Sequence, residues 1–195
     1  MLDLRIQQHF IDSADLQYQA AEPLAKPVEA GIQALLACVT SGGKVLVAGW
    51  GGTAVSAPYF AGLFVGGFER ERPELAALAL SAEGAAWAAL PDDQILARQV
   101  RALGHMGDVL LVITATGEEK VLQQAVSAAH EREMTVIALT GKGGGALAKL
   151  LRETDVHVCV PHERAARIRE VQQLVLHCLC DGVDAQLLGE QEISE

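Results

Sequence analysis

The sequence predicts an α/β fold, a three-layer αβα sandwich built on a five-stranded parallel sheet. Short apolar runs recur at regular intervals and alternate with helical patterns, as expected for βαβ units. Half of the 195 residues are hydrophobic but only 4% are aromatic, which suits a sheet covered by helices on both faces. The expected strands are Lys44–Gly49, Glu74–Leu80, Asp108–Thr114, Met134–Thr140 and Asp155–Val160.

Helical patterns fill the stretches between and around these strands. Two helices are expected before the first strand, Leu2–Ala21 and Pro27–Thr40, because Pro23 and Pro27 interrupt the pattern. A long closing helix is expected over Glu163–Leu188. The core helices are expected over Thr53–Gly66, Asp92–Leu103, Glu118–Arg132 and Ala146–Arg152.

The chain is expected to form one domain over residues 1–195. Its parts are the N-terminal helices (1–42), a doubly wound core (43–160) and the closing helix (161–190). The helices at both ends carry more apolar faces than one small sandwich needs. Because such helices commonly pack between subunits, an oligomer is expected.

Charge and composition exclude several classes of function. The formal net charge of −10 argues against direct binding of nucleic acid, whose backbone requires a basic face. Asp3 stands where a signal peptide needs basic residues. The uncharged stretch 45–68 contains six glycines and Pro58, which favours a buried strand–helix unit over a membrane span. A cytoplasmic protein that contacts no membrane is therefore expected.

The four cysteines predict buried, reduced thiols. They show neither a CxxC pair nor the spacing of a zinc site. They are Cys38, Cys159, Cys178 and Cys180.

The first candidate site follows the first strand, where Gly49-Trp50-Gly51-Gly52-Thr53 leads into a helix. Glycines permit φ > 0 and a close approach of a ligand to the backbone. The N–H groups at the start of a helix attract anions. Gly51, Gly52 and Thr53 are therefore candidate ligands for a phosphate or another small anion. A purely structural turn explains the same pattern, and both interpretations stay open.

The second candidate loop is Thr114-Ala115-Thr116-Gly117-Glu118-Glu119, which again joins a strand to a helix. In open α/β sheets ligands bind beyond the carboxyl ends of the strands, so Thr114, Thr116 and Gly117 are candidate phosphate ligands. Thr116 and Glu119 also fit a capping box that serves only the helix. A carboxylate about 5 Å from a phosphate would repel it by about 3 kcal/mol at an effective dielectric of about 20.

A third glycine-rich loop, Gly141-Lys142-Gly143-Gly144-Gly145, differs from a P-loop. In a P-loop the lysine follows the glycines and is itself followed by Ser or Thr. Here Lys142 precedes most of the glycines, so the loop is interpreted as a turn.

Taken together, these motifs resemble the sugar isomerase (SIS) domain family over nearly the whole chain. The stretch GWGGTAVSAPYFA is similar to the family loop GNGGSAADAQHFA. The stretches 68–73 and 99–108 are further matches. The resemblance points to the branch that contains phosphoheptose isomerases and the DnaA-initiator-associating protein DiaA, with residues 99–108, 166–170 and 178–181 more similar to DiaA. It implies a homotetramer of αβα sandwiches with sugar-phosphate pockets at subunit edges.

The resemblance also places the metal-binding and acid/base residues of the isomerases. The family's His and Glu on the first core helix fall on Tyr59 and Leu63, and its Gln on the last helix falls on Arg169. The family's final His is retained as His177, the single catalytic candidate. Leucine cannot accept a proton, and this set is poor for a divalent cation. No cofactor is expected, and zinc only if the chain is an isomerase.

The loops also depart from the family pattern. The serine that ends the family's phosphate loop corresponds to Glu119, and the asparagine of its glycine loop corresponds to Trp50. Both changes oppose a bound sugar phosphate, whereas the retained threonines and glycines favour one.

Three functions remain open. The main hypothesis is a non-enzymatic, DiaA-like scaffold that binds the replication initiator DnaA, with Leu187 and Leu188 as a partner surface or as oligomer packing. The second is a phosphoheptose isomerase acting on sedoheptulose 7-phosphate, with His177 and a further base such as Glu69 or Glu83. The third is a sugar-phosphate sensor without turnover.

Overall fold

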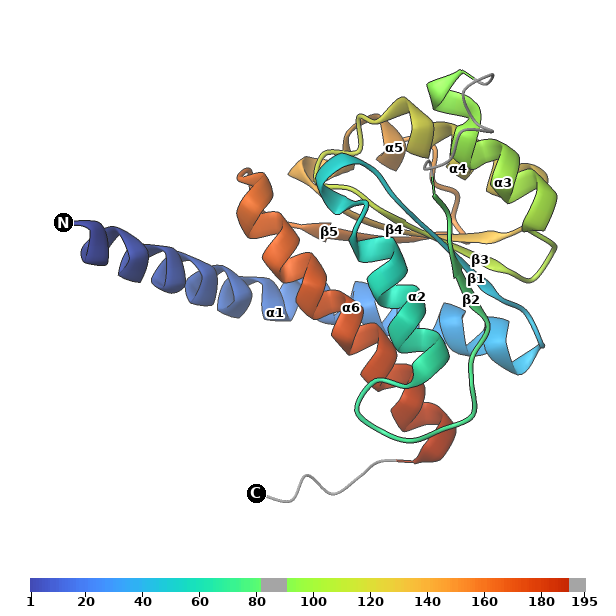
Figure 1. Ribbon diagram of the computed structural model, residues 1–195, viewed down its shortest axis with the longest axis horizontal. Coiled ribbons are helices and arrows are strands. Elements are labelled where there is room, and N and C mark those ends of the chain that lie inside the picture. Colours follow the sequence, from blue (N-terminus) through green and yellow to red (C-terminus); the bar gives the residue numbers. More distant parts are fainter. Residues whose placement is uncertain (82–90, 190–195) are drawn as a thin grey trace.

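The computed structural model describes residues 1–81 and 91–189, which contain a parallel sheet covered by helices on both faces (Figure 1). Its five strands lie in the order β2-β1-β3-β4-β5. This arrangement confirms the predicted αβα sandwich. The strands are β1 (Val45–Gly49), β2 (Ala77–Ala79), β3 (Val109–Ile113), β4 (Thr135–Gly141) and β5 (Val156–Val160).

Six α-helices complete the described part of the chain. Helices α1, α2 and α6 cover one face of the sheet, and α3, α4 and α5 cover the other (Figure 1). Their bounds are α1 (Leu2–Thr40), α2 (Ser56–Gly66), α3 (Ile95–Leu103), α4 (Lys120–Glu131), α5 (Gly145–Ala148) and α6 (Ala165–Leu188).

Alternate residues of the three central strands, β1, β3 and β4, contribute to two separate cores. On β3, Leu111 points to the core formed with α1, α2 and α6, whereas Leu110 points to the core formed with α3 and α4. All five residues of β1 and of β3 are buried. A strand buried on both faces must be apolar throughout, and this explains the continuous apolar runs of the sequence.

Helix α1 corrects the prediction of two N-terminal helices. It runs without a break through Pro23 and Pro27. A proline inside a helix removes one backbone hydrogen bond and favours a break. Here a stripe of buried residues continues across both prolines, so tertiary packing overrides the local preference. The stripe consists of Leu16, Ala20, Leu24, Val28, Gly31, Leu35 and Cys38.

Several other boundaries also differ from the prediction. Strand β2 is limited to three residues, and the region predicted as Thr53–Gly66 divides into a 3-10 turn, Gly51–Thr53, followed by α2. Helix α5 ends at Ala148 instead of Arg152. No helix in the described ranges has the length and apolar character that crossing a membrane requires.

Asp108 ties the starts of β1 and β3 together. Its carboxylate accepts the backbone N–H of Lys44 at 2.9 Å and that of His105 at 2.9 Å. The Lys44 ammonium lies 2.6 Å from the same carboxylate, which is almost fully buried. Burial raises the pKa of Asp108, but the hydrogen bonds from Lys44 and His105 outweigh it, so the pKa is held below the usual range.

Asp108→Asn is expected to lower the free energy of unfolding by about 2 kcal/mol at pH 7, because it removes a charged acceptor from buried donors. The lowered pKa stabilises the folded protein above the ordinary carboxyl pKa, and this contribution is lost as the pH falls through the pKa of the folded state. Urea denaturation at pH 7 and pH 3 should therefore show the difference between wild type and variant shrink at acid pH. A constant difference would contradict this account.

Candidate active site

The carboxyl ends of β1 and β3 are joined through Thr53. The Thr53 hydroxyl donates to the carbonyl oxygen of Ile113 at 2.6 Å and accepts the N–H of Trp50 at 3.3 Å. Its side chain is buried. Thr53 was predicted as an anion ligand, and in the structure its hydroxyl holds the glycine loop against the end of β3.

Thr53→Val is expected to lower the free energy of unfolding by about 1–3 kcal/mol, because the buried Ile113 carbonyl loses its hydroxyl donor. Thr53→Ser keeps the hydroxyl and should lose less. Thermal denaturation of both variants measures this difference. A larger loss in Thr53→Ser, which lacks the methyl group that Thr53→Val keeps, would indicate that packing of this methyl group contributes more than the hydrogen bond.

The second loop is closed by an internal carboxylate. The hydroxyls of Thr114 and Thr116 both donate to Glu119, at 2.6 and 3.0 Å. The Thr114 hydroxyl also accepts the N–H groups of Thr116 and Gly117, at 3.1 and 3.0 Å. The polar groups of this predicted phosphate loop are therefore already paired with one another.

These contacts replace the predicted capping box. Helix α4 begins at Lys120, and Glu119 is its N-cap residue without a side-chain cap. The Thr116 hydroxyl donates to the Glu119 carboxylate and accepts the backbone N–H of Glu118, which precedes the helix. The neighbouring Glu118 accepts the N–H of Ala146 and so links the second loop to the third.

The third loop packs against the second. Gly117 has φ +75, and a Cβ added to it would collide with the Gly144 carbonyl. Lys142 has φ +50, followed by three glycines of positive φ. The loop leads into a helix of only four residues, which agrees with a turn and not with a P-loop.

His177, on α6, faces α2 and lies in a small cluster of polar side chains. Its Nε2 lies 2.8 Å from the Tyr59 hydroxyl and 3.2 Å from the Gln173 amide nitrogen. The ring of Phe68 packs against the imidazole at a centroid distance of 5.2 Å. If Tyr59 donates to Nε2, the imidazole proton is on Nδ1 and the Nε2 lone pair accepts this hydrogen bond. The imidazole is half-exposed.

Arg169 extends this cluster towards the glycine loop. Arg169, Gln173 and His177 are spaced four residues apart on α6 and therefore lie on one face of that helix. The Arg169 guanidinium lies directly over Gly52, where an added Cβ would collide with it. The structure thus brings Gly52 and His177, two predicted site residues, to the same side of α6.

The positions that the resemblance assigns to a metal do not fit a divalent cation. They offer one imidazole, a phenol hydroxyl, a leucine and a guanidinium, and a guanidinium repels a metal. Leu63, on α2, is half-buried and packs against the core formed with α1 and α6. Within residues 1–81 and 91–189, no three His, Cys, Asp or Glu side chains converge as a metal site.

A cavity of 620 Å³ opens on the other side of the glycine loop. It is bordered by the ends of β1 and β2 and does not include His177. Its described lining residues are Gly49, Trp50, Gly51, Ala54, Val55, Pro58, Ala79, Leu80 and Ser81. Trp50 is therefore a wall of this cavity and also packs against the core formed with α3 and α4.

Other predicted residues lie away from this site. Leu187 and Leu188 end α6 and are 37% and 42% exposed. Glu69, proposed as a further base, is exposed to solvent. Glu83 lies outside the described residues. The prediction of buried thiols holds for Cys38 and Cys180, but Cys178 is exposed and Cys159 is half-buried.

Sequence reasoning missed Gln173 and Phe68. The spacing of four residues from Arg169 through Gln173 to His177 was a signal that placed the amide on the same helix face as His177. The contact between Phe68 and His177 joins segments more than a hundred residues apart, and no local pattern indicates it.

Comparison with known proteins agrees with this geometry. Residues 8–141 match the family model of the SIS domain. The phosphoheptose isomerase of Methylibium petroleiphilum is 59% identical over 198 residues, covering 100% of this chain and 99% of that protein. The solved phosphoheptose isomerase GmhA of Neisseria gonorrhoeae superposes with a TM-score of 0.88 at 39% identity, covering 94% of this chain and 100% of that one.

The match to the SIS-domain model and the five-stranded parallel sheet define a SIS-domain protein. Within that class, the chain belongs to the phosphoheptose isomerase family. A second solved member, from Francisella tularensis, has a TM-score of 0.89 at 38% identity and covers 94% of this chain and 98% of that one.

These relatives overturn the main functional hypothesis. The DiaA-like scaffold for DnaA was wrong, because the similar proteins that span the whole chain are named phosphoheptose isomerase. The structure explains the error in part. Leu179 and Cys180, within the ending that resembled DiaA, are fully buried and serve packing.

Proposed function

We propose that this chain is an aldose–ketose isomerase that acts on a phosphorylated seven-carbon sugar, with sedoheptulose 7-phosphate as the ketose. The observation that carries the proposal is the His177–Tyr59 pair, at 2.8 Å, on the side of α6 that faces the glycine loop. The family membership supports the substrate class.

The proposed chemistry is a proton transfer between adjacent carbons. His177 Nε2 takes the proton from the carbon beside the carbonyl group, which produces an enediolate. A proton then moves from the hydroxyl oxygen of that carbon to the former carbonyl oxygen, and the imidazolium returns its proton to the former carbonyl carbon. Tyr59 and Gln173 both contact Nε2, so the Tyr59 hydroxyl must turn from Nε2 to a sugar oxygen before this nitrogen acts as the base. No step requires a metal, for which the residues present are unsuited.

One observation favours a second candidate, a protein that binds a sugar phosphate without turning it over. Leu63 occupies the position of the family's glutamate, and no carboxylate bonds His177 among the residues that the structure describes. An isomerase with a single base and no partner carboxylate would have lost part of its electrostatic stabilisation. Such a protein would bind the sugar phosphate and sense it.

His177→Gln is expected to lower kcat by a factor of about 10²–10⁴, because a general base typically contributes that much. Tyr59→Phe should lower kcat less, since it removes only the hydroxyl partner of the imidazole. NMR of sedoheptulose 7-phosphate incubated with purified protein measures the interconversion directly.

Leu174→Ala, on an exposed position of the same helix, serves as the control and should retain activity. If wild type binds the ketose but never converts it, the sensor function replaces the isomerase. Conversion that survives in His177→Gln would remove His177 from the chemistry.

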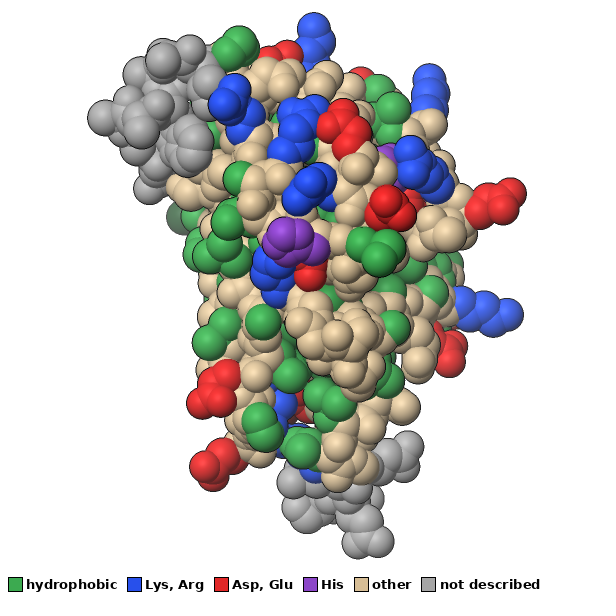
Figure 2. Space-filling model, turned by 90° about the vertical axis from the view of Figure 1, so that its right-hand side faces the viewer, with side chains coloured by type: hydrophobic (Ala, Val, Ile, Leu, Met, Phe, Trp, Pro, Cys, Tyr) green, Lys and Arg blue, Asp and Glu red, His purple; other side chains and the backbone are tan. Residues whose placement is uncertain are grey.

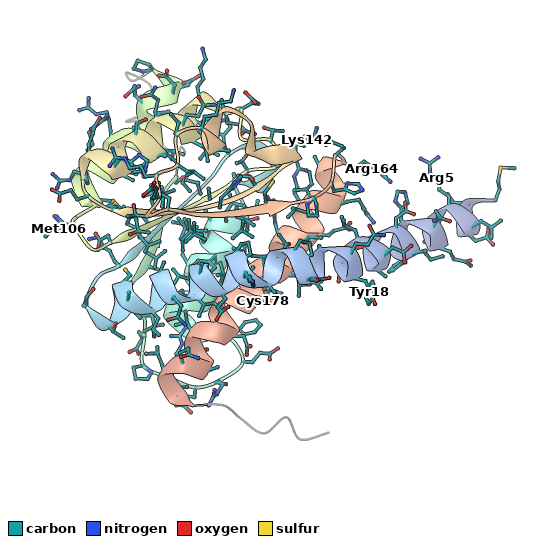
Figure 3. All side chains as sticks on the ribbon, turned by 180° about the vertical axis from the view of Figure 1, so that it is seen from behind. Arg5, Tyr18, Met106, Lys142, Arg164 and Cys178 are labelled. Atoms are coloured by element: carbon teal, nitrogen blue, oxygen red, sulfur yellow. The ribbon has the colours of Figure 1, made fainter. Side chains whose placement is uncertain are left out.

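We also propose that the chain assembles as a homotetramer through α1. The first half of α1 projects from the body (Figure 1), and Tyr18 and Arg5 point away from it (Figure 3). Leu4, Ile11 and Tyr18 recur every seven residues on one helix face and are 64%, 50% and 86% exposed. An exposed apolar stripe of this kind favours packing against another copy.

Ile11→Glu is expected to reduce the mass in solution from four times 20.6 kDa towards that of smaller assemblies, because it places a charge in the apolar stripe. Light scattering after size exclusion measures the mass. Gln19→Glu adds the same charge off the stripe and should leave the mass unchanged. A monomeric wild type would contradict the proposal.

A further inference from the structure

Arg169 is a charged side chain at the glycine loop whose counter-ion the structure does not supply. It is exposed, and within residues 1–81 and 91–189 neither a hydrogen bond nor an ion pair engages its guanidinium. Its neighbours on α6 differ. Arg164 pairs with Asp12 at 3.3 Å, and Arg167 pairs with Glu170.

The guanidinium nevertheless lies against the glycine loop. It packs over Gly52, where an added Cβ would collide with it and displace its flexible end. Helix α6 itself is fixed near the strand ends, because the buried Gln172 amide donates to the Thr114 carbonyl oxygen at 2.7 Å. A guanidinium positioned over exposed backbone presents several N–H donors in the geometry that a phosphate accepts.

The threonine loop cannot offer the same anion site. The Thr114 and Thr116 hydroxyls are bonded to Glu119, and the N–H groups of Thr116 and Gly117 are bonded to Thr114. A phosphate at this loop would have to break those hydrogen bonds and approach the carboxylate that makes them. The Glu119 side chain thus occupies this loop as an internal anion.

We propose that the phosphate of the substrate is bound by Arg169 over the Gly51–Gly52 turn, and that Glu119 closes the threonine loop to it. This deepens the proposed function and rests on it for the identity of the phosphorylated sugar. Arg169 and His177 are two helical turns apart, about 12 Å along the axis. An extended seven-carbon sugar phosphate has its reactive carbons and its phosphate at opposite ends and spans a comparable length. Gln173 lies between them, within reach of the sugar hydroxyls.

Calorimetric titration with sedoheptulose 7-phosphate, and separately with inorganic phosphate, tests the assignment. Arg169→Gln is expected to raise both dissociation constants at least tenfold. The matched control is Arg98→Gln, which removes an exposed arginine from α3 on the other face of the sheet and should change them less than twofold. Equal effects of the two variants would mean that only net charge matters and would overturn the proposal.

Gly52→Ala tests position without removing the charge. Its Cβ would displace the flexible end of Arg169, so phosphate binding should weaken about as much as in Arg169→Gln while the melting temperature is retained. Gly62→Ala adds a Cβ that meets no atom within 4 Å and should bind like wild type. Unchanged binding by Gly52→Ala would show that the observed placement of Arg169 is not used.

The double variant Arg169→Gln, Glu119→Ser tests the closed loop. Removal of the carboxylate frees both threonine hydroxyls, so inorganic phosphate binding should recover at least fivefold relative to Arg169→Gln alone. No recovery would overturn the role given to Glu119. If Glu119→Ser alone lost the binding of inorganic phosphate, Glu119 would support the anion site instead of closing the threonine loop, and the role given to it would be wrong.

These outcomes separate the site from the reaction. If phosphate binding depends on Arg169 but no isomerisation is detected, the proposed isomerase function is wrong and the proposed phosphate site stands. If the protein isomerises the sugar phosphate and Arg169→Gln does not change the KM, the proposed phosphate site is wrong and the isomerase function stands. If the wild-type protein binds inorganic phosphate but not sedoheptulose 7-phosphate, Arg169 is an anion site and the proposed substrate is wrong.

Discussion

The placement of α6 across the ends of the strands is the constraint on which the site depends. Gln172, buried in this helix, donates to the carbonyl oxygens of Thr114 at 2.7 Å and Leu139 at 3.3 Å. A buried amide must satisfy its donors, so this contact fixes the position of the helix along β3 and β4. At the other end of α6, Asp184 forms a buried ion pair with Arg72 at 2.5 Å. Arg169, Gln173 and His177 are thereby held beside α2.

Three residues around this site differ in charge or polarity from those expected in related isomerases. Arg169 stands where related isomerases are expected to carry an amide, Leu63 where they carry a carboxylate, and Glu119 where they carry a hydroxyl. Each change alters what the site can hold, because a cation over the glycine loop attracts an anion and a carboxylate in the threonine loop repels one. On the face shown in Figure 2, basic and acidic side chains are interspersed.

Much of the fold and part of the site followed from sequence patterns. The alternating apolar runs predicted every strand, and the three loops after β1, β3 and β4 were correctly placed at one edge of the sheet. The roles of Thr53 and Thr116 were harder to predict. A threonine before a helix has the same sequence signature whether its hydroxyl binds a ligand, caps the helix or joins two loops. Only the partner atom distinguishes these roles. The DnaA-binding hypothesis failed because residues that resembled DiaA, such as Cys180, are core residues and carry packing information.

The sequence alone determined the α/β class, the order of its elements and the presence of His177 without its expected carboxylate partner, because hydrophobic period and residue identity are local properties. Tertiary structure decided the rest. It showed that α1 continues through Pro23 and Pro27, that Tyr59 and Phe68 surround His177, and that Arg169 lies over Gly52. These facts depend on contacts between segments far apart in the chain, whose geometry is set by packing of the whole core and not by any local pattern.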